Sequence, residues 1–363
     1  MTVPPPPALT QDATAPTMTS AVRAEGAPAT GTSPAHPAER AITAADVTAI
    51  IVNWNTEDLL DASLRSLRDH GGERADEMEI VVVDNGSSDG SLDLLAASWP
   101  DVTVIANEDN VGFCRANNQA IEVTTRPYLL LINADAMLQP GCLPALLDRM
   151  ASDDRVGVVA PRLVYGDGRF QRWTAGAAPS LPSMANYLFF TDRFAERSAV
   201  FTGHYLGRDT SDAFAPDWVS SACMLVRRAM FDEVGAMSDE IFVYMDDVEL
   251  CQRGRDGGWT VWYEPAGTCT HLMGQSTKRK TGAASPEAMR AFNRYFERRH
   301  GRRQTTVLRA LQVGGFGLRV VAYRASGAAR RDDGHRAAAR AHLNHLKLSL
   351  ERPTRSYESK ESR

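Results

Sequence analysis

Four short runs of apolar residues, one of them interrupted by Thr103, mark the first part of the chain. They lie at residues 49–52, 80–83, 102–105 and 128–132. Runs of this length are typical of strands that are buried on both faces of a parallel sheet. Between them, residues 56–70 carry leucines at helical spacing, and residues 113–123 carry a weaker helical stripe. This alternation predicts an α/β fold with a Rossmann-like, mostly parallel sheet flanked by helices.

Each predicted strand runs into a cluster of polar residues. The clusters are Asn53-Trp-Asn55, Asp84-Asn-Gly-Ser-Ser-Asp-Gly90, Asn107-Glu-Asp-Asn110 and Asn133-Ala-Asp135. Ligands of open parallel sheets bind outside the carboxyl ends of the strands, so we expect these clusters to converge on one site. Any one cluster taken alone is equally typical of a turn, because Asn, Asp, Gly and Ser are common turn residues.

A later acidic run places Asp246, Asp247 and Glu249 among apolar residues. Carboxylates rarely lie against apolar surface without a partner or a chemical task. If a helix begins here, the acidic pair lies at its N-terminal end, where the helix dipole stabilises negative charge. A carboxylate held in this way is a candidate general base, and capping of the helix is the alternative role.

Composition divides the chain into three parts. Residues 1–45 hold eight of the nineteen prolines and few large apolar residues, which predicts a disordered leader. Residues 278–363 carry 21 Lys and Arg against 7 Asp and Glu, whereas the rest of the chain has 19 against 38. This basic tail indicates an anionic partner such as a membrane surface, and the acidic body disfavours a nucleic-acid partner. Residues 46–277 remain as the predicted folded domain.

Several classes of protein are disfavoured by motifs that the sequence lacks. Neither G-x-x-x-x-G-K-[ST] nor a G-x-G-x-x-G after the first strand occurs, which argues against P-loop kinases and ordinary dehydrogenases. The five cysteines form no C-x-x-C pair, which argues against a disulfide framework and a zinc knuckle. We find no signal-peptide pattern and no apolar stretch of about 18 residues, so we expect a cytoplasmic protein.

The order of these motifs resembles family 2 of the inverting glycosyltransferases, in the rhamnosyltransferase-like branch of bacterial cell-surface polysaccharide assembly. The resemblance covers residues 46–277. Besides the clusters and the acidic run, it rests on Asn110-Val-Gly-Phe113, the segment from Asp217 to Arg228, and His271-Leu-Met-Gly-Gln-Ser276. It implies a GT-A fold in which residues 46–150 bind the nucleotide sugar and residues 151–277 bind the acceptor.

The resemblance also implies a donor site with a divalent cation. The donor-binding residues would be Asn53, Asp84, Asn85, Asn110, Asn117, Asn133 and Asp135. Asn133-Ala-Asp135 corresponds to the D-x-D motif of this fold, with an amide in place of the first carboxylate. Asp135 and His271 would bind Mg²⁺ or Mn²⁺ together with the diphosphate, and the imidazole suits Mn²⁺ better. A purely structural His271 is the alternative.

Asp247 aligns with the catalytic base of the family. It would take a proton from an acceptor hydroxyl, whose oxygen displaces the nucleoside diphosphate with inversion at the anomeric carbon. Asp246 and Trp218 are expected beside the acceptor or just behind it. Ser221 and Ser238 depart from the family pattern, which bears on the identity of the donor more than on the type of reaction.

The implied function is metal-dependent transfer of rhamnose or a similar sugar from a nucleoside-diphosphate sugar to a glycan or a polyprenyl-diphosphate-linked acceptor. Two alternatives remain. A catalytically inactive nucleotide-sugar-binding scaffold fits the amide at Asn133. A sugar nucleotidyltransferase would need a loop rich in glycine and arginine after the first strand, where this chain has Asn53-Trp-Asn55.

The basic tail is amphipathic beyond His300, with apolar residues between arginines. We predict a helical tail that lies at the inner face of the cell membrane or packs on the body of the protein. Because glycine disfavours helix, we expect Gly314, Gly315 and Gly317 to weaken it as one continuous helix.

Overall fold

The computed structural model describes residues 41–195, 197–205, 209–272, 286–330 and 333–350. Most of the predicted leader, residues 1–45, lies outside these ranges. The expected boundary between domain and tail near residue 277 also lies outside them, as do Gly274 and Ser276 of the last motif.

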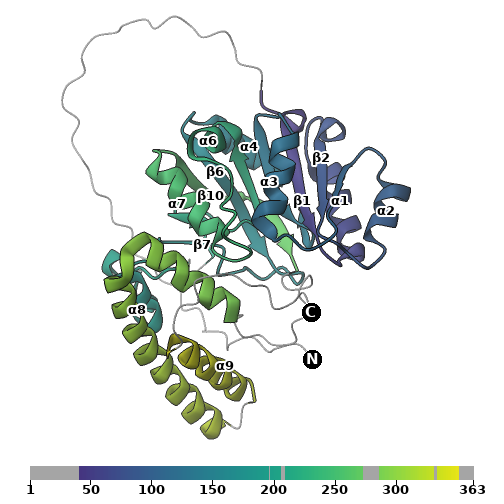
Figure 1. Cartoon of the computed structure of the whole chain (residues 1–363). Helices are drawn as coiled ribbons and strands as arrows, with labels where there is room; N and C mark the ends of the chain where they lie inside the picture. The colour runs from purple at the N-terminus through teal and green to yellow at the C-terminus, as the bar shows by residue number, and fades with distance from the viewer. Residues whose placement is uncertain (1–40, 196, 206–208, 273–285, 331–332, 351–363) are drawn as a thin grey trace, which may run out of the picture. The chain divides into compact units, whose positions relative to one another are not determined.

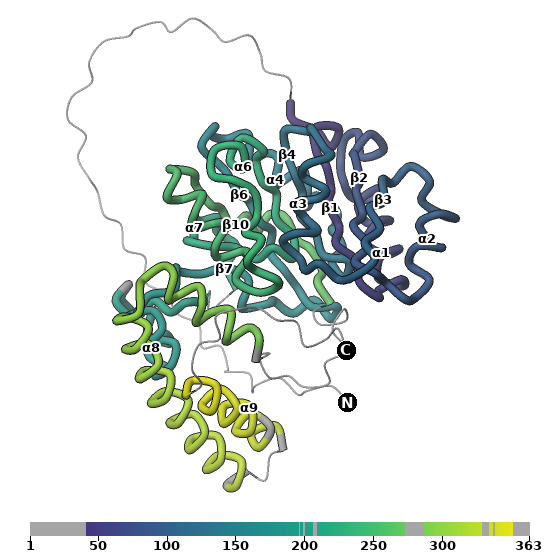
Figure 2. The backbone as a smooth tube through the Cα atoms, viewed as in Figure 1, coloured from purple at the N-terminus to yellow at the C-terminus, as the bar shows by residue number. Residues whose placement is uncertain are grey.

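An eight-stranded sheet forms the centre of the fold, in the order β3-β2-β1-β4-β9-β6-β10-β5 (Figure 1). The four strands expected from the apolar runs are mutually parallel neighbours: β1 (Val47–Asn53), β2 (Glu79–Asp84), β3 (Thr103–Ala106) and β4 (Tyr128–Asn133). Figure 2 shows these segments side by side. The predicted α/β fold with a mostly parallel sheet is confirmed.

The second half of the sheet mixes strand directions. It contains β5 (Ala136–Leu138), β6 (Val156–Val164), β9 (Cys223–Arg227) and β10 (Thr260–His271). Strand β9 is antiparallel to both of its neighbours, and β5 is antiparallel to β10. A separate two-stranded sheet pairs β7 (Ala175–Gly176) with β8 (Trp218–Val219).

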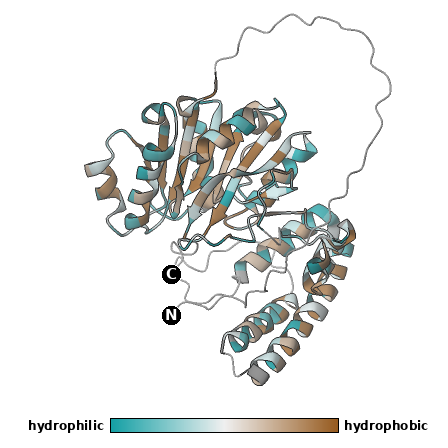
Figure 3. Cartoon of the chain, turned by 180° about the vertical axis from the view of Figure 1, so that it is seen from behind, coloured by the Kyte–Doolittle hydropathy of each residue, from teal (hydrophilic) through white to brown (hydrophobic). Residues whose placement is uncertain are grey.

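Helices cover both faces of the sheet. One face packs against α1 (Glu57–His70), α2 (Ser91–Ser98) and α4 (Cys142–Ala151), and the other against α3 (Phe113–Val123), α6 (Arg228–Val234) and α7 (Asp246–Asp256). Successive residues of a strand therefore enter different cores, as Ile50 and Ile51 do. This two-sided burial explains the apolar runs of β1, β2 and β4 (Figure 3). The expected two-sided burial of residues 102–105 is wrong, because β3 is the edge strand of the sheet and three of its four residues are exposed.

Short 3-10 helices complete the connections, at Ala44–Asp46, Ala75–Glu77, Thr191–Phe194 and Ala199–Phe201. The tail contributes α8 (Pro286–Arg330) and α9 (Asp333–Leu350), which confirms the predicted helical tail. Helix α8 packs against α5 (Leu181–Leu188).

The expectation that three glycines weaken α8 is wrong. The helix continues through Gly314, Gly315 and Gly317, and its backbone departs from helical geometry at Gly301 instead, with φ 78° and ψ 169°. A Cβ atom on Gly315 would lie 2.5 Å from the Cβ of Leu188. Glycine at this position therefore permits close packing on α5, and this contact outweighs its low helix propensity.

The tail is also tied to α5 by Arg319, which is 7% exposed. Its Nε donates to the carbonyl of Leu188 at 3.2 Å, and its guanidinium lies over the ring of Phe190. Of the two roles left open for the tail, packing on the body is thus observed. Membrane binding stays a prediction.

Candidate active site

The strand register places the first polar clusters next to one another. In the parallel pairing of β1 with β2, Asn53 stands opposite Asp84, and in the pairing of β1 with β4, Val52 stands opposite Asn133. The carboxyl ends of three central strands therefore meet at one edge of the sheet.

Asn53 and Asp84 form a fully buried pair at this edge. The Nδ2 of Asn53 donates to Asp84 Oδ2 at 2.8 Å, and the other carboxylate oxygen accepts from the backbone N–H of Ser87 at 2.8 Å. Asn53 Oδ1 accepts from the hydroxyl of Thr56 at 2.6 Å. These bonds fix the turn after each strand. A direct contact of either side chain with the donor stays a prediction.

A network of side-chain amides joins the loops after β2 and β3. Asn85 donates to Asn110 Oδ1 at 3.3 Å and accepts from Asn107 at 3.0 Å, and Asn107 also bonds Gln119 of α3. The structure thus brings Asn85 and Asn110 together. Asn117 is 1% exposed and its side chain donates to the carbonyl of Phe113 in its own helix, and its contact with the donor stays a prediction.

Asp135 and His271 come together where β5 pairs with β10. The register sets His271 opposite Ala136, and the imidazole Nε2 lies 3.4 Å from Asp135 Oδ1. Asp135 is only 3% exposed. Within the described residues, no group of three Asp, Glu, His or Cys side chains is arranged to hold a metal ion. If Asp135 and His271 bind a cation, a substrate would have to complete the site; their role as ligands stays a prediction.

The acidic run starts α7 after a strained turn. Tyr244 and Met245 have φ of 66° and 68°, a left-handed conformation that costs non-glycine residues on the order of 1–3 kcal/mol each. The helix begins directly afterwards at Asp246, which accepts a 2.7 Å hydrogen bond from the hydroxyl of Ser221. Asp247 accepts from the N–H of Val248 at 2.8 Å. The turn and these bonds hold both carboxylates in place.

Burial, and then the neighbouring carboxylate of Asp246, raise the pKa of Asp247 to about 8. Burial also raises the pKa of Asp246, which the hydrogen bond from Ser221 partly opposes. Asp246 is buried and Asp247 is half-buried. Two adjacent carboxylates in such surroundings resist losing both protons. A carboxylate with a pKa near neutrality is suited to accept a proton in catalysis.

Consecutive residues connect the two candidate centres. Ser221 bonds Asp246 at the start of α7, and the carbonyl of Ala222 accepts from the N–H of Asn133 at 3.0 Å. Asn133 lies two residues before Asp135. The base helix and the loop that carries Asp135 are therefore anchored to one short segment before β9.

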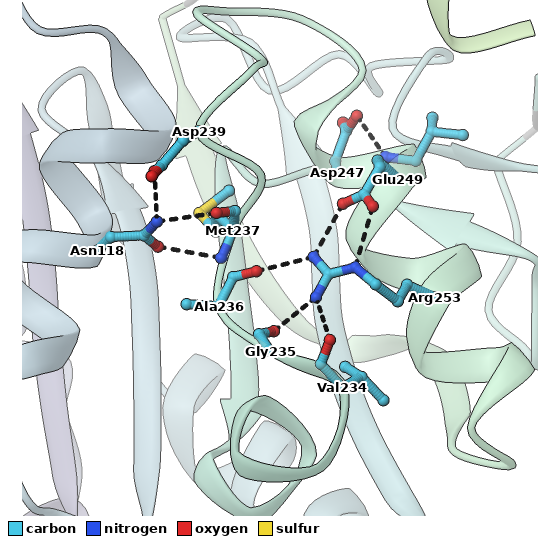
Figure 4. A network of polar contacts seen from close by, with 10 residues as sticks. Asn118, Val234, Gly235, Ala236, Met237, Asp239, Asp247, Glu249 and Arg253 are labelled. Carbon is cyan, nitrogen blue, oxygen red and sulfur yellow. Dashed lines mark hydrogen bonds and ion pairs between the residues drawn. The ribbon is translucent and has the colours of Figure 1, made fainter. Parts of the chain in front are cut away.

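Glu249 belongs to a hydrogen-bond network around Arg253 (Figure 4). The guanidinium binds both carboxylate oxygens of Glu249, at 3.0 and 2.9 Å. It also donates to the backbone carbonyls of Val234, Gly235 and Ala236. These bonds attach the loop after α6 to α7, so Glu249 has a structural role.

The same loop is attached to α3 through Asn118 (Figure 4). Its side-chain amide exchanges hydrogen bonds with the backbone of Met237, at 2.8 and 3.0 Å, and donates to Asp239. The segment that departs from the family pattern around Ser238 is thus fixed from both sides.

Trp218 lies in β8 and is 4% exposed. Its indole N–H donates to the carbonyl of Ala177 at 3.1 Å, and its ring packs against His204 and Tyr205. Burial lowers the pKa of His204 to about 4, so this imidazole is neutral at pH 7. A role of Trp218 beside the acceptor stays a prediction.

Residues 48–235 match the family model described as glycosyl transferase family 2. The chain belongs to this family. The predicted membership is confirmed, and the match disfavours the alternative of a sugar nucleotidyltransferase.

Two relatives of this family 2 glycosyltransferase occur in Mycobacterium tuberculosis. It is 28% identical to N-acetylglucosaminyl-diphospho-decaprenol L-rhamnosyltransferase over 213 residues. The aligned part covers 56% of this chain and 69% of the relative. It is 26% identical to the pre-mycofactocin glycosyltransferase over 230 residues. The aligned part covers 62% of this chain and 42% of the relative.

Two solved structures share the fold of the glycosyltransferase. The mannosyltransferase PcManGT from Pyrobaculum calidifontis, in complex with GDP-Man and Mn²⁺, matches with a TM-score of 0.53 and 17% identity over 84% of this chain and 85% of that chain. GalNAc-T7 with UDP, GalNAc and Mn²⁺ matches with a TM-score of 0.51 and 16% identity, covering 69% of this chain and 48% of that chain. The predicted GT-A fold is confirmed.

Sequence analysis of the glycosyltransferase did not predict the contacts of two residues at the site, Ser221 and Gln171. Ser221 stood out as a departure from the family pattern, but nothing indicated its bond to Asp246. Gln171, which contacts His271, is a lone glutamine in a connecting segment. Neither periodicity nor spacing distinguishes such a residue from other polar residues of a loop.

Proposed function

We propose that the protein is an inverting glycosyltransferase that moves rhamnose or a similar sugar from a nucleoside-diphosphate sugar to a glycan or polyprenyl-diphosphate-linked acceptor. The observation that carries this proposal is the placement of Asp247. Its carboxylate has a raised pKa and lies in the first turn of α7, which Ser221 and Ala222 connect to the Asp135 loop. The name of the mycobacterial rhamnosyltransferase supports this class of donor and acceptor, and a role in cell-surface polysaccharide synthesis.

In the proposed reaction, Asp247 accepts the proton of an acceptor hydroxyl. The hydroxyl oxygen forms a bond to the anomeric carbon as the bond from that carbon to the diphosphate breaks, so the configuration inverts. Proton transfer to a positioned base contributes typically 10²- to 10⁴-fold to such a step, as an order of magnitude. The hydrogen bond from Ser221 to Asp246 fixes the start of α7, and this helix start positions Asp247.

The donor site fits a divalent cation, Mg²⁺ or Mn²⁺. A carboxylate oxygen of Asp135 and an imidazole nitrogen of His271 face each other at 3.4 Å, and both ligand types suit these ions. When bound, the cation would neutralise charge on the departing diphosphate. With two protein ligands, strong binding requires oxygens from the donor.

A thermal-shift screen of nucleotide sugars with Mn²⁺, Mg²⁺ or chelator tests this function. We expect one class of donor to raise the melting temperature, and to do so only with a cation, because the ligand completes the site. A hit is then incubated with acceptor glycans, and the product is checked for inversion. Donor binding without turnover on any acceptor would favour the inactive scaffold, and no shift with any nucleotide sugar would contradict the proposal.

We also propose that α8 and α9 contact the inner face of the cell membrane. In the described part of the chain, no helix combines the length and hydrophobicity needed to cross a bilayer. The two helices carry both hydrophobic and hydrophilic residues (Figure 3). Their exposed apolar side chains are Val307, Leu318, Val321 and Leu350. Basic amphipathic helices with such residues bind anionic membrane surfaces.

Co-sedimentation with phospholipid vesicles tests the membrane contact. We expect binding to vesicles with anionic lipid that weakens at high salt, and Val321→Asp should reduce it because Val321 is 66% exposed. Val200→Asp is a matched control, since Val200 is 76% exposed but lies outside the tail. Equal loss in both variants, or equal binding to neutral vesicles, would argue against the tail as the contact.

A further inference from the structure

Gln171 is a buried polar residue beside the proposed cation site. It lies between β6 and β7, is 2% exposed, and its backbone N–H donates to the carbonyl of Leu163 at 2.9 Å. Its side chain reaches His271, the last residue of β10. A buried amide retains its place only with its hydrogen-bonding atoms satisfied.

The orientation of the Gln171 amide follows from its neighbours. One end of the amide contacts the backbone carbonyl of His271 at 2.5 Å and that of Val164 at 3.3 Å. Carbonyl oxygens can only accept, so this end must be the Nε2 donor. The amide oxygen therefore faces Nδ1 of His271, at 3.0 Å.

This contact selects one tautomer of His271. An amide oxygen only accepts, so Nδ1 must carry the hydrogen of the bond. In the neutral imidazole, Nε2 then presents a lone pair, and this atom is the one that faces Asp135 Oδ1 at 3.4 Å. Two acceptors at this separation repel each other unless a positive charge lies at or between them.

We propose that Gln171 is a positioning residue for the donor-bound cation. It orients His271 so that the Nε2 lone pair and the carboxylate of Asp135 converge on one point. Outer partners of this kind fix the tautomer and direction of metal-binding histidines. This inference rests on the proposed cation-dependent donor site and adds to it a residue that makes no contact with the donor.

The test compares Gln171→Met with Gln139→Met in the full chain. Methionine has a similar length but cannot donate to the carbonyls or accept from Nδ1. Gln139 is the matched control, because its Nε2 donates to the hydroxyl of Thr270, one residue before His271. Free Mn²⁺ is measured by electron paramagnetic resonance, with UDP, GDP and dTDP each added as the nucleotide probe.

We expect Gln171→Met to bind Mn²⁺ with nucleotide about 10- to 100-fold more weakly than the wild type, and Gln139→Met to bind as the wild type does. Equal affinity in the wild type and Gln171→Met would overturn the role of Gln171 alone. Absence of nucleotide-dependent Mn²⁺ binding in the wild type would instead overturn the cation-dependent donor site on which the inference rests.

A spectroscopic measurement tests the tautomer directly, without metal. Two-bond ¹H–¹⁵N spectra report which imidazole nitrogen carries the hydrogen, and His271→Gln identifies the signal. We expect the hydrogen on Nδ1 in the wild type and a mixture of tautomers in Gln171→Met. A wild-type signal with the hydrogen on Nε2 would overturn the inference. If Gln171→Met does not fold, the wild-type spectrum decides alone, because its outcome does not depend on a variant at position 171.

Discussion

Asp247→Asn is expected to abolish sugar transfer while nucleoside-diphosphate binding remains almost unchanged. Asparagine has the same shape and its Oδ1 can still accept from the N–H of Val248, but it cannot take a proton from the acceptor. Loss of a general base lowers the rate by roughly 10²- to 10⁴-fold. The measurement is the initial rate of nucleoside-diphosphate release at saturating donor and acceptor, together with donor affinity.

Glu249→Gln is the matched control for this variant. It makes the same change of carboxylate to amide two residues later, where the side chain binds Arg253. We expect this control to keep transfer activity, because Glu249 anchors a loop and does not exchange protons. Turnover of Asp247→Asn at the wild-type rate would remove Asp247 from the mechanism.

The raised pKa of Asp247 also predicts how the stabilities of the wild type and of Asp247→Asn differ as the pH changes. An aspartate in the unfolded chain has a pKa of about 3.9, whereas Asp247 in the fold has a pKa of about 8. Between these values the folded state holds a proton that the unfolded state has lost. The contribution of Asp247 to stability is therefore present below pH 4 and declines as the pH rises towards 8.

We expect Asp247→Asn to gain stability relative to the wild type as the pH rises from about 4 to about 8, since the amide does not titrate. Chemical denaturation across this range gives the difference in the free energy of unfolding. A constant difference would show that Asp247 has an ordinary pKa in the fold.

The rate of transfer by the wild type should increase over the same pH range, because only the ionised carboxylate can act as a base.

Asp135→Ala is expected to lose the cation-dependent part of donor binding. Asp135 is the carboxylate that we assign to the proposed site among the described residues, and its Oδ1 lies 3.4 Å from His271 Nε2. Without it the imidazole alone would face the diphosphate, so the cation has no anionic protein ligand. Titration calorimetry with the donor found by the screen, with Mn²⁺ and with chelator, measures the effect.

The donor affinity of Asp135→Ala in Mn²⁺ should equal that of the wild type in chelator. The chelated wild type is therefore the internal control, and a melting curve without ligand shows that the variant is folded. If the variant binds the donor more tightly with Mn²⁺ than with chelator, as the wild type does, then Asp135 is not a ligand of the cation.

Local patterns predicted the four parallel strands and the helices α1 and α3. Residues 80–83 and 128–132 are continuous apolar runs because β2 and β4 are buried on both faces, and this requirement appears in the sequence itself. The leucines of α1 mark the side of the helix that packs on the sheet. The role of Gly315 in α8 was misjudged, since its packing partner Leu188 lies over a hundred residues earlier in the chain.

The sequence by itself determined the α/β fold, the family and the two acidic positions on which the proposed chemistry depends, because apolar periodicity and ordered motifs are local properties of the chain. Only the tertiary structure decided which side chains meet. Asp135 reaches His271 through the pairing of β5 with β10, and Asp246 reaches Ser221 through the packing of α7. Burial and nearby charge, which raise the pKa of Asp247, exist only once these distant segments exclude water together.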